Sequence, residues 1–302
     1  MRSSAKPFLK WAGGKGQLLG QMSERFPEEL LGGNVHTYIE PFLGGGAPFF
    51  HIAQLYPIER FFISDINADL ILVYKTIRQE VGELIQTLEA IQTHYYSLEP
   101  HEQEAYYYDT RKRFNEGRRY TDFSSFSKSW LERSSQTIFL NKTCFNGLFR
   151  FNRKDEFNTS FGSYKNPLIC DTPNLLAAAE VLRKVAIERG DFSCCSSLVD
   201  AGTFVYFDPP YRPLSKTANF TSYSSYTFND QNQYRLSLFY RYLHTKGAKL
   251  MLSNSDAANG DGGTVLETLY RDFRVERVRA RRAINRDASK RGKISELLIM
   301  NY

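Results

Sequence analysis

Short β-forming runs that end at a proline, a glycine or an acidic residue alternate along this chain with segments of helical periodicity. The runs lie at 37–42, 61–65, 203–211 and 248–256. The helical patterns lie at roughly 15–26, 46–56, 68–92, 175–189 and 230–246. Strands that alternate with helices form a mostly parallel sheet with helices on both faces, so the sequence predicts an α/β fold.

Two parts of the chain depart from this alternation. Residues 273–282 alternate apolar and charged side chains and residues 294–302 are apolar, which predicts a final antiparallel pair of strands. Residues 93–174 are rich in Tyr, Phe, Asn and Arg, with helices expected at 101–117 and 125–140 and Asn-Gly and Phe-Gly turn signals after them. We interpret 93–174 as an inserted, mainly helical domain, and 1–92 with 175–302 as the domain that contains the sheet.

Positive charge is concentrated in two places, although the formal net charge is only +6. Between Arg111 and Lys154 there are eleven basic and three acidic residues, and between Arg271 and Lys293 there are ten basic and three acidic residues. Such basic faces favour a polyanion such as nucleic acid, although a solvated arginine-rich surface produces the same pattern.

Several function classes are disfavoured by what the chain lacks. No run of 18 apolar residues suits a transmembrane helix, and the N-terminus has no apolar signal-peptide core. The cysteines lack CxxC spacing and no Cys/His cluster suits a metal. We therefore expect a cytoplasmic protein with free thiols, with no membrane association and no metal.

A glycine-rich turn follows the first strand, in the sequence EPFLGGG at 40–46. Glycines between a strand and a helix allow the backbone and the helix N–H groups to approach a ligand closely. Asp65 ends the next strand, 21 residues after Gly44, which suits a carboxylate that binds the ribose of an adenosine-type cofactor. The pattern is not GxGxxG, which argues against NAD; Asp65 could instead only cap the following helix.

A second glycine segment, FLKWAGGKGQLL at 8–19, is not a P-loop, because Gly16 rather than Ser or Thr follows Lys15. Trp11 and Lys15 could offer a flat face and a cation to a small ligand. Taken alone, however, the residue types favour a core tryptophan and a solvated lysine.

The most specific chemical signal is FVYFDPPY at 204–211. Asp208 follows an apolar strand, where α/β sheets bind ligands, and Pro209 and Pro210 remove two N–H donors. The local groups are therefore acceptors that can hold a planar amino group, while Tyr211 offers a ring for stacking. A rigid turn at the strand end is the alternative.

This arrangement suits methylation of an exocyclic amine. Acceptors orient the nitrogen toward the methyl group of S-adenosylmethionine, and catalysis rests on positioning and electrostatics. A base within a duplex has to be flipped out of the stack to reach such a pocket.

With these motifs in place, the sequence resembles the Dam-type DNA adenine methyltransferases almost end to end. Six blocks match in the family's order: FLKWAGGK (8–15), YIEPFLGGGAPFF (38–50), FFISDINADLI (61–71), the recognition hairpin (141–164), VYFDPPYRPLSKTANFTSYS (205–224) and SKRGKISELLIMNY (289–302). The resemblance implies a Rossmann-like S-adenosylmethionine-dependent methyltransferase sheet with an inserted target-recognition domain.

The resemblance also implies roles for individual residues. Asp208, Pro209, Pro210 and Tyr211 form the catalytic motif. The cofactor-binding residues are Trp11, Lys15, Phe42, Gly44, Gly46, Asp65 and Asp208. The DNA-binding residues are Lys10, Asn146, Leu148, Arg150, Ser160 and Tyr164.

Two positions depart from the family pattern. Ser160 stands where the family usually has a proline that helps to read the third base pair. The resemblance therefore does not predict which third base pair this chain reads. Ser163 replaces an arginine that faces phosphate.

The expected function is therefore adenine-N6 methylation of double-stranded DNA at a short site, GATC by resemblance, by a monomer. A partner restriction endonuclease and roles in replication or mismatch repair are all compatible with this resemblance. Two alternatives stay open at this point: a catalytically silent or regulatory DNA-binding module, and an amino methyltransferase acting on RNA or protein.

Overall fold

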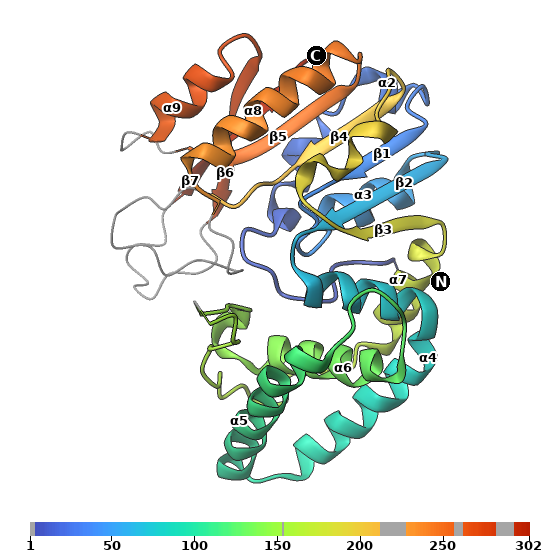
Figure 1. Ribbon diagram of the computed structural model, residues 1–302, viewed down its shortest axis with the longest axis vertical. Coiled ribbons are helices and arrows are strands. Elements are labelled where there is room, and N and C mark those ends of the chain that lie inside the picture. Colours follow the sequence, from blue (N-terminus) through green and yellow to red (C-terminus); the bar gives the residue numbers. More distant parts are fainter. Residues whose placement is uncertain (1–3, 153, 212–227, 257–261, 282–292) are drawn as a thin grey trace.

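A seven-stranded sheet forms the centre of the computed structural model, which describes residues 4–152, 154–211, 228–256, 262–281 and 293–302 (Figure 1). The strands are β1 (Thr37–Glu40), β2 (Arg60–Asp65), β3 (Val185–Arg189), β4 (Thr203–Phe207), β5 (Lys249–Ser255), β6 (Arg274–Arg281) and β7 (Lys293–Met300). Their order is β3-β2-β1-β4-β5-β7-β6. Neighbours from β3 to β5 are parallel, whereas β7 is antiparallel to both β5 and β6. The α/β fold and the final antiparallel pair are thus confirmed.

The helices that follow and precede these strands agree with most of the sequence predictions. The α-helices are α1 (Leu19–Ser23), α2 (Glu28–Leu31), α3 (Ala47–Leu55), α4 (Ala68–Ser97), α5 (Pro100–Gly117), α6 (Lys128–Thr143), α7 (Thr172–Leu182), α8 (Asp230–Thr245) and α9 (Gly262–Leu269). Short 3-10 helices are η1 (Lys15–Gln17), η2 (Arg118–Tyr120), η3 (Phe145–Gly147) and η4 (Phe192–Leu198). The sequence did not predict α2 or α9.

One predicted helix was wrong at its end. The helix expected over 175–189 stops at Leu182, and residues Val185–Arg189 form strand β3 beside β2. Val185 and Ile187 are buried in this pairing. Tertiary pairing with β2 overrides the continuous helical pattern, because strand preference depends strongly on what the residue packs against.

Apolar residues cover both faces of the sheet with a two-residue period. Tyr38, Phe204 and Tyr206 belong to the core on one face, whereas Val205 and Phe207 belong to the core on the other. All five residues of β4 are buried. A parallel strand that is buried on both sides reads as a continuous apolar run, which is why β4 was evident in the sequence.

Helices α4, α5 and α6 lie beyond the β3 side of the sheet (Figure 1). Helix α4 packs against both α6 and α7, and α5 packs against α6. The backbone of α4 is non-helical at Glu80, so the element consists of two helical segments joined at a kink. Residue 93, where the sequence suggested the inserted domain would begin, lies within α4.

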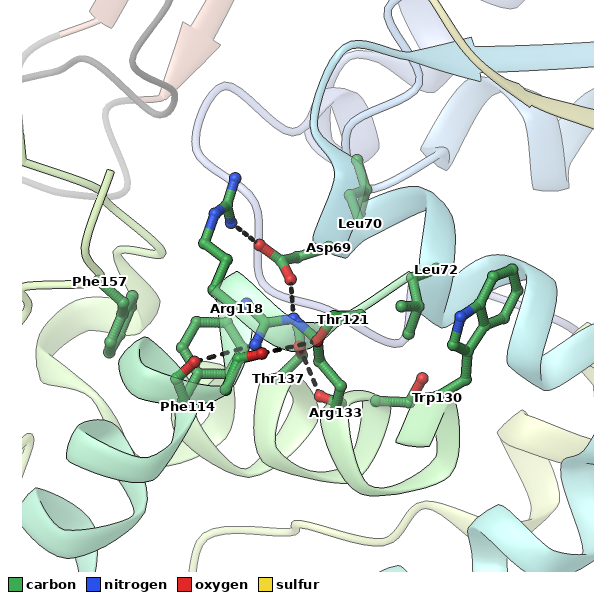
Figure 2. Close-up of polar contacts among 12 residues, drawn as sticks. Asp69, Leu70, Leu72, Phe114, Arg118, Thr121, Trp130, Arg133, Thr137 and Phe157 are labelled. Atoms are coloured by element: carbon green, nitrogen blue, oxygen red, sulfur yellow. Dashed lines mark hydrogen bonds and ion pairs between the residues drawn. The ribbon is translucent and has the colours of Figure 1, made fainter. Parts of the chain in front are cut away.

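A buried carboxylate joins these helices to the start of α4 (Figure 2). Asp69 is fully buried, and its two oxygens accept from Arg118 of η2 and from Arg133 of α6. Arg133 also donates to the carbonyl oxygen of Phe114 at 2.9 Å, and Arg118 forms a second ion pair with Asp155 at 2.8 Å. Arg118 and Arg133, two of the basic residues between Arg111 and Lys154, are therefore used for ion pairs inside the protein rather than for a solvent-facing surface.

The described ranges offer neither a membrane-spanning helix nor a cluster of metal ligands. None of the helices there is long and apolar enough to cross a membrane. The described residues also contain no group of three or more His, Cys, Asp and Glu side chains placed to hold a metal ion. The four cysteines are free thiols.

We expect Asp69→Asn to lower the free energy of unfolding by about 3–5 kcal/mol, because breaking a buried ion pair leaves buried charge without its partner. Urea denaturation measures this change. The control is Asp109→Asn, which breaks the exposed Asp109–Arg113 pair on α5 and should cost less than about 1 kcal/mol. Similar small losses in both variants would contradict a structural role for the buried cluster.

Candidate active site

The carboxyl ends of three adjacent parallel strands bring the sequence motifs together. Strand β1 lies between β2 and β4. The glycine turn follows β1, Asp65 ends β2, and Asp208 follows β4. Because parallel strands end at the same edge of a sheet, three motifs far apart in the sequence form one site, as expected for a doubly wound fold.

Asp65 ties the glycine turn to the end of β2. Its carboxylate accepts the backbone N–H of Gly44 at 3.0 Å and that of Asn67 at 2.9 Å. Burial raises the pKa of Asp65 above its usual value, and the backbone N–H donors act against that rise. The cap of α4 is the Asn67 side chain, which accepts the N–H of Leu70, so Asp65 is not the helix cap.

The glycines of the turn are required by both conformation and contact. Gly44 and Gly46 have φ values of +48° and +68°, in the region that disfavours side chains. A Cβ at Gly44 would lie 2.8 Å from Cδ1 of Trp11, and one at Gly46 would lie 2.7 Å from the hydroxyl of Tyr74. Trp11 and Tyr74 therefore pack directly on the turn, in the space that side chains at these two positions would need.

Phe42 precedes these glycines and lies in an aromatic cluster. Its ring stacks on Phe192 with the centroids 5.5 Å apart, and its centroid is 5.7 Å from that of Phe228 in an edge-on arrangement. Phe42 remains partly exposed, so it could also contact a ligand at the rim of the turn.

Lys15 is buried, and its ammonium group binds Asp208. The Lys15 side chain is 1% exposed, and Nζ lies 2.8 Å from Oδ1 of Asp208 and 2.7 Å from the carbonyl oxygen of Gly13. The same Asp208 oxygen accepts the hydroxyl of Ser253, on β5, at 3.0 Å. The solvated lysine that the residue type alone favoured is therefore wrong.

Two further carboxyl groups lie at this site, and sequence reasoning identified neither. Glu296 on β7 accepts the hydroxyl of Tyr211 at 2.8 Å and lies 3.7 Å from Nζ of Lys15. Glu40, the last residue of β1, is buried and accepts the hydroxyl of Tyr38 at 2.6 Å. Its position at the end of a strand, next to the glycine turn, was a signal that could have drawn attention to Glu40.

Burial in low-dielectric surroundings raises the pKa values of the three acids at the site. Burial raises the pKa of Asp208, whereas the Lys15 ammonium acts to lower it. Burial likewise raises the pKa of Glu296, with Lys15 again opposing. Glu40 has a pKa well above its usual range, mainly because it is buried. One buried cation therefore serves a group of three acids, which is the kind of site where perturbed titration accompanies function.

The remaining residues of the DPPY motif surround Asp208. Pro209 is buried and Pro210 is exposed. Nζ of Lys15 lies 4.7 Å from the centroid of the Tyr211 ring, so one side of that ring contacts the lysine. A stacked base would have to use the rest of the ring.

Three of the predicted DNA-binding residues form one cluster. Nζ of Lys10 lies 4.8 Å from the Tyr164 ring, whose hydroxyl accepts the backbone N–H of Asn146 at 2.7 Å. Asn146 is exposed and has a positive φ of 55°. The backbone of Lys10 exchanges two hydrogen bonds with the side chain of Asn141 in α6, which fixes the N-terminal segment against the recognition segment.

The recognition hairpin has two faces. Isolated antiparallel bridges join Cys144 to Phe161 and Phe151 to Phe157, and the arms between them form no longer strand. Alternate residues on both arms face away from the protein core: Leu148, Arg150, Asn158 and Ser160. The residues between them are buried: Phe149, Phe151, Phe157 and Thr159.

The outward face is held in place by local contacts. Nε of Arg150 donates to Oδ1 of Asn158 across the hairpin at 3.0 Å. The buried Phe149 ring lies 6.0 Å from Trp11, which packs on the glycine turn. The hairpin and the strand-end site are thus neighbours, and their side chains could act on one ligand.

Comparison with known proteins gives a consistent match over nearly the whole chain. The family model described as "D12 class N6 adenine-specific DNA methyltransferase" matches residues 11–284. The type II methyltransferase M.MjaIII of Methanocaldococcus jannaschii is 48% identical over 298 residues, which cover 98% of this chain and 99% of that protein. The type II methyltransferase M1.LlaDCHI of Lactococcus lactis subsp. cremoris is 36% identical, covering 98% and 95%. A DNA adenine methylase of Vibrio cholerae is 32% identical, also covering 98% and 95%.

We expect Lys15→Met to lower the free energy of unfolding by about 3–5 kcal/mol at about pH 8, because two largely buried carboxylates lose their cation. The pKa values of Asp208 and Glu296 are already raised in the folded protein, and they rise further without the cation. A carboxyl with a raised folded pKa favours folding at low pH and disfavours it as the pH rises, so the loss should be smaller at about pH 5.

Urea titrations at the two pH values measure this difference. The matched control is Lys249→Met, which breaks a partly exposed pair with Glu29 and should cost less than about 1 kcal/mol. A loss for Lys15→Met that does not depend on pH would contradict stabilisation of the ionised Asp208 and Glu296 carboxyls by Lys15.

Proposed function

This chain belongs to the D12 class of N6 adenine-specific DNA methyltransferases, and from that premise we propose that it methylates the adenine of GATC sites in duplex DNA. The family implies S-adenosylmethionine as the methyl donor and DNA as the substrate. The observation that most supports the proposal is the position of Asp208. Its carboxylate is oriented by Lys15 and Ser253 at the strand edge that also carries the glycine turn.

For the cofactor, we propose the glycine turn and its surroundings. Gly44 and Gly46 form a tight turn that packs against Trp11 and Tyr74, and the partly exposed Trp11 and Phe42 offer aromatic surface beside it. Asp65 is partly buried between the turn and β2, and we propose that it binds the ribose. Because the Lys15 ammonium already binds Asp208, we propose that Lys15 acts at the cofactor mainly through its charge.

For catalysis, we propose that Asp208 and the backbone of Pro209 accept the two N–H bonds of the adenine amino group, while Tyr211 stacks against the flipped base. S-adenosylmethionine supplies a methyl group on a positively charged sulfur. The Asp208 carboxylate then orients the nitrogen lone pair toward that methyl group and interacts favourably with the charge that develops on nitrogen. Pro210 keeps the motif rigid.

For DNA recognition, we propose that residues 93–174 form the target-recognition domain and that its hairpin enters the duplex. Lys10, Asn146 and Tyr164 are grouped beside the outward residues Leu148 and Arg150. The fork of donors on an arginine suits the O6 and N7 atoms of guanine. Ser160 is exposed on the same face, at the position where the family usually has proline.

Support for GATC comes from the resemblance to Dam-type enzymes together with the similarity to a protein named DNA adenine methylase. Two of the most similar relatives are named type II methyltransferases. We therefore propose that the enzyme serves a restriction-modification system with a partner endonuclease, rather than replication or mismatch repair. We further propose that it acts as a monomer in the cytoplasm.

We expect Asp208→Ala to abolish methyl transfer to DNA while duplex binding stays within about threefold. Asp208 contributes in the transition state, whereas affinity rests mainly on phosphate contacts. Transfer of a labelled methyl group and fluorescence anisotropy measure the two properties separately. Near-normal turnover in the variant would refute the assignment of the DPPY motif.

Arg150→Ala tests sequence reading on a panel that contains GATC and every single substitution of it. The unaltered protein should methylate GATC fastest. In the variant, one G·C position should lose about 1–3 kcal/mol of discrimination, so substituted sites at that position react nearly as well as GATC.

Arg113→Ala, on the exposed surface of α5, is the matched control and should leave the ranking of sites unchanged. A uniform loss over all sites in Arg150→Ala would instead indicate a phosphate contact. If the unaltered protein prefers another member of the panel or none, the GATC assignment is wrong.

A further inference from the structure

The charges that the described residues place around Asp208 do not cancel. Among those residues Lys15 is the cation of the site, and Asp208 and Glu296 lie 2.8 Å and 3.7 Å from its ammonium group. Within the described ranges, the other titratable groups that interact with Glu296 are the hydroxyls of Tyr206 and Tyr211, which are neutral at ordinary pH. With both carboxyls ionised, the group of three carries one net negative charge.

Glu40 is held apart from this group by a hydrogen bond of its own. Its carboxyl oxygen accepts the hydroxyl of Tyr38 at 2.6 Å. Burial raises the pKa of Glu40 well above its usual range. The two carboxyl groups that lie within 4 Å of the Lys15 ammonium group in the described part of the chain are Asp208 and Glu296.

This net charge matters for the proposed methyl transfer. The lone pair of the adenine amino nitrogen forms the new N–C bond, and the electrons of the breaking S–C bond remain on sulfur, which becomes neutral. The nitrogen carries the positive charge until it releases a proton to the Asp208 carboxylate or to water. Asp208 paired with Lys15 is neutral overall and would stabilise that charge weakly, so a second carboxylate has a large effect in a low-dielectric site.

Glu296 also restrains the two side chains that contact Asp208 or the base. It accepts the hydroxyl of Tyr211 at 2.8 Å, and Nζ of Lys15 lies between the two acids and 4.7 Å from the Tyr211 ring. Glu296 itself is fixed in the sheet, because β7 pairs with β5 on one side and β6 on the other. The carboxylate is therefore presented by a strand rather than by a loop.

We propose that Glu296 is a positioning residue for methyl transfer, which holds Lys15 and Tyr211 in place and gives the Asp208 site its net negative charge. This inference rests on the proposed methyltransferase activity. It assigns a role to the antiparallel strand β7, which otherwise only completes the sheet.

The test is Glu296→Gln in single-turnover methylation of a GATC duplex with labelled S-adenosylmethionine. We expect the rate constant to fall by about 10- to 100-fold. The KM values for DNA and cofactor should change by less than about threefold, because the lost interaction acts on the charge that develops during transfer.

The pH profile separates this role from a merely structural one. In the unaltered protein, the rate should decline as the pH falls through the raised pKa values of Asp208 and Glu296. In Glu296→Gln, one ionisation is gone and its repulsion on Asp208 is removed, so the decline should become less steep and move to lower pH.

Two further variants serve as controls. Glu276 lies on the neighbouring strand β6, and its carboxylate pairs with Arg25 at 2.6 Å, outside the site. Glu276→Gln should therefore leave the rate and the pH profile unchanged. Glu296→Asp keeps the charge but withdraws it from Tyr211. It should slow the rate while keeping the acid decline near its original position.

The outcomes distinguish the two levels of inference. If the unaltered protein transfers no methyl group to any DNA, the proposed function fails. If it does, an unchanged rate and pH profile in Glu296→Gln overturn the role of Glu296. Should Glu296→Gln not fold, Glu296→Asp decides, because a rate equal to that of the unaltered protein would exclude a positioning role.

Discussion

The parallel arrangement of β2, β1 and β4 is the constraint on which the rest of the molecule depends. These adjacent strands end at one edge, so the glycine turn, Asp65 and Asp208 meet there although they are far apart in the sequence. The same edge leaves room for backbone rather than side chains, because Gly44 and Gly46 have positive φ values and close neighbours. The proposed cofactor site and the Asp208 carboxylate therefore lie on the same edge of the sheet.

Ion pairs link the residues that the sheet brings to this edge. Lys15 comes from the N-terminal segment, Asp208 from the end of β4 and Glu296 from β7, so one buried ammonium group connects three distant parts of the chain. Burying a charge is costly unless it is paired and hydrogen-bonded. The three groups therefore depend on one another. Loss of any one of them changes the pKa values of the other two and the electrostatic potential at the site.

Two sets of contacts connect the helices beyond β3 to this site. Asp69 binds Arg118 and Arg133 at the first turn of α4, four residues after Asp65, and so anchors α5 and α6 to the strand that carries the proposed ribose ligand. Closer to the surface, Trp11 packs between the glycine turn and Phe149 of the hairpin. These contacts hold the hairpin, which we propose to read DNA, beside the proposed catalytic motif.

Local patterns in the sequence determined the α/β class, the glycine turn and the strand that ends in DPPY, because each depends on residues only a few positions apart. Strand β3 was not predictable in this way, since pairing with β2 decided its conformation. The burial of Lys15, the inward direction of Arg118 and Arg133 and the contact of Glu296 with Tyr211 likewise required the tertiary structure. Their partners are distant in sequence, and only the packed fold determines which charged side chains lose contact with water.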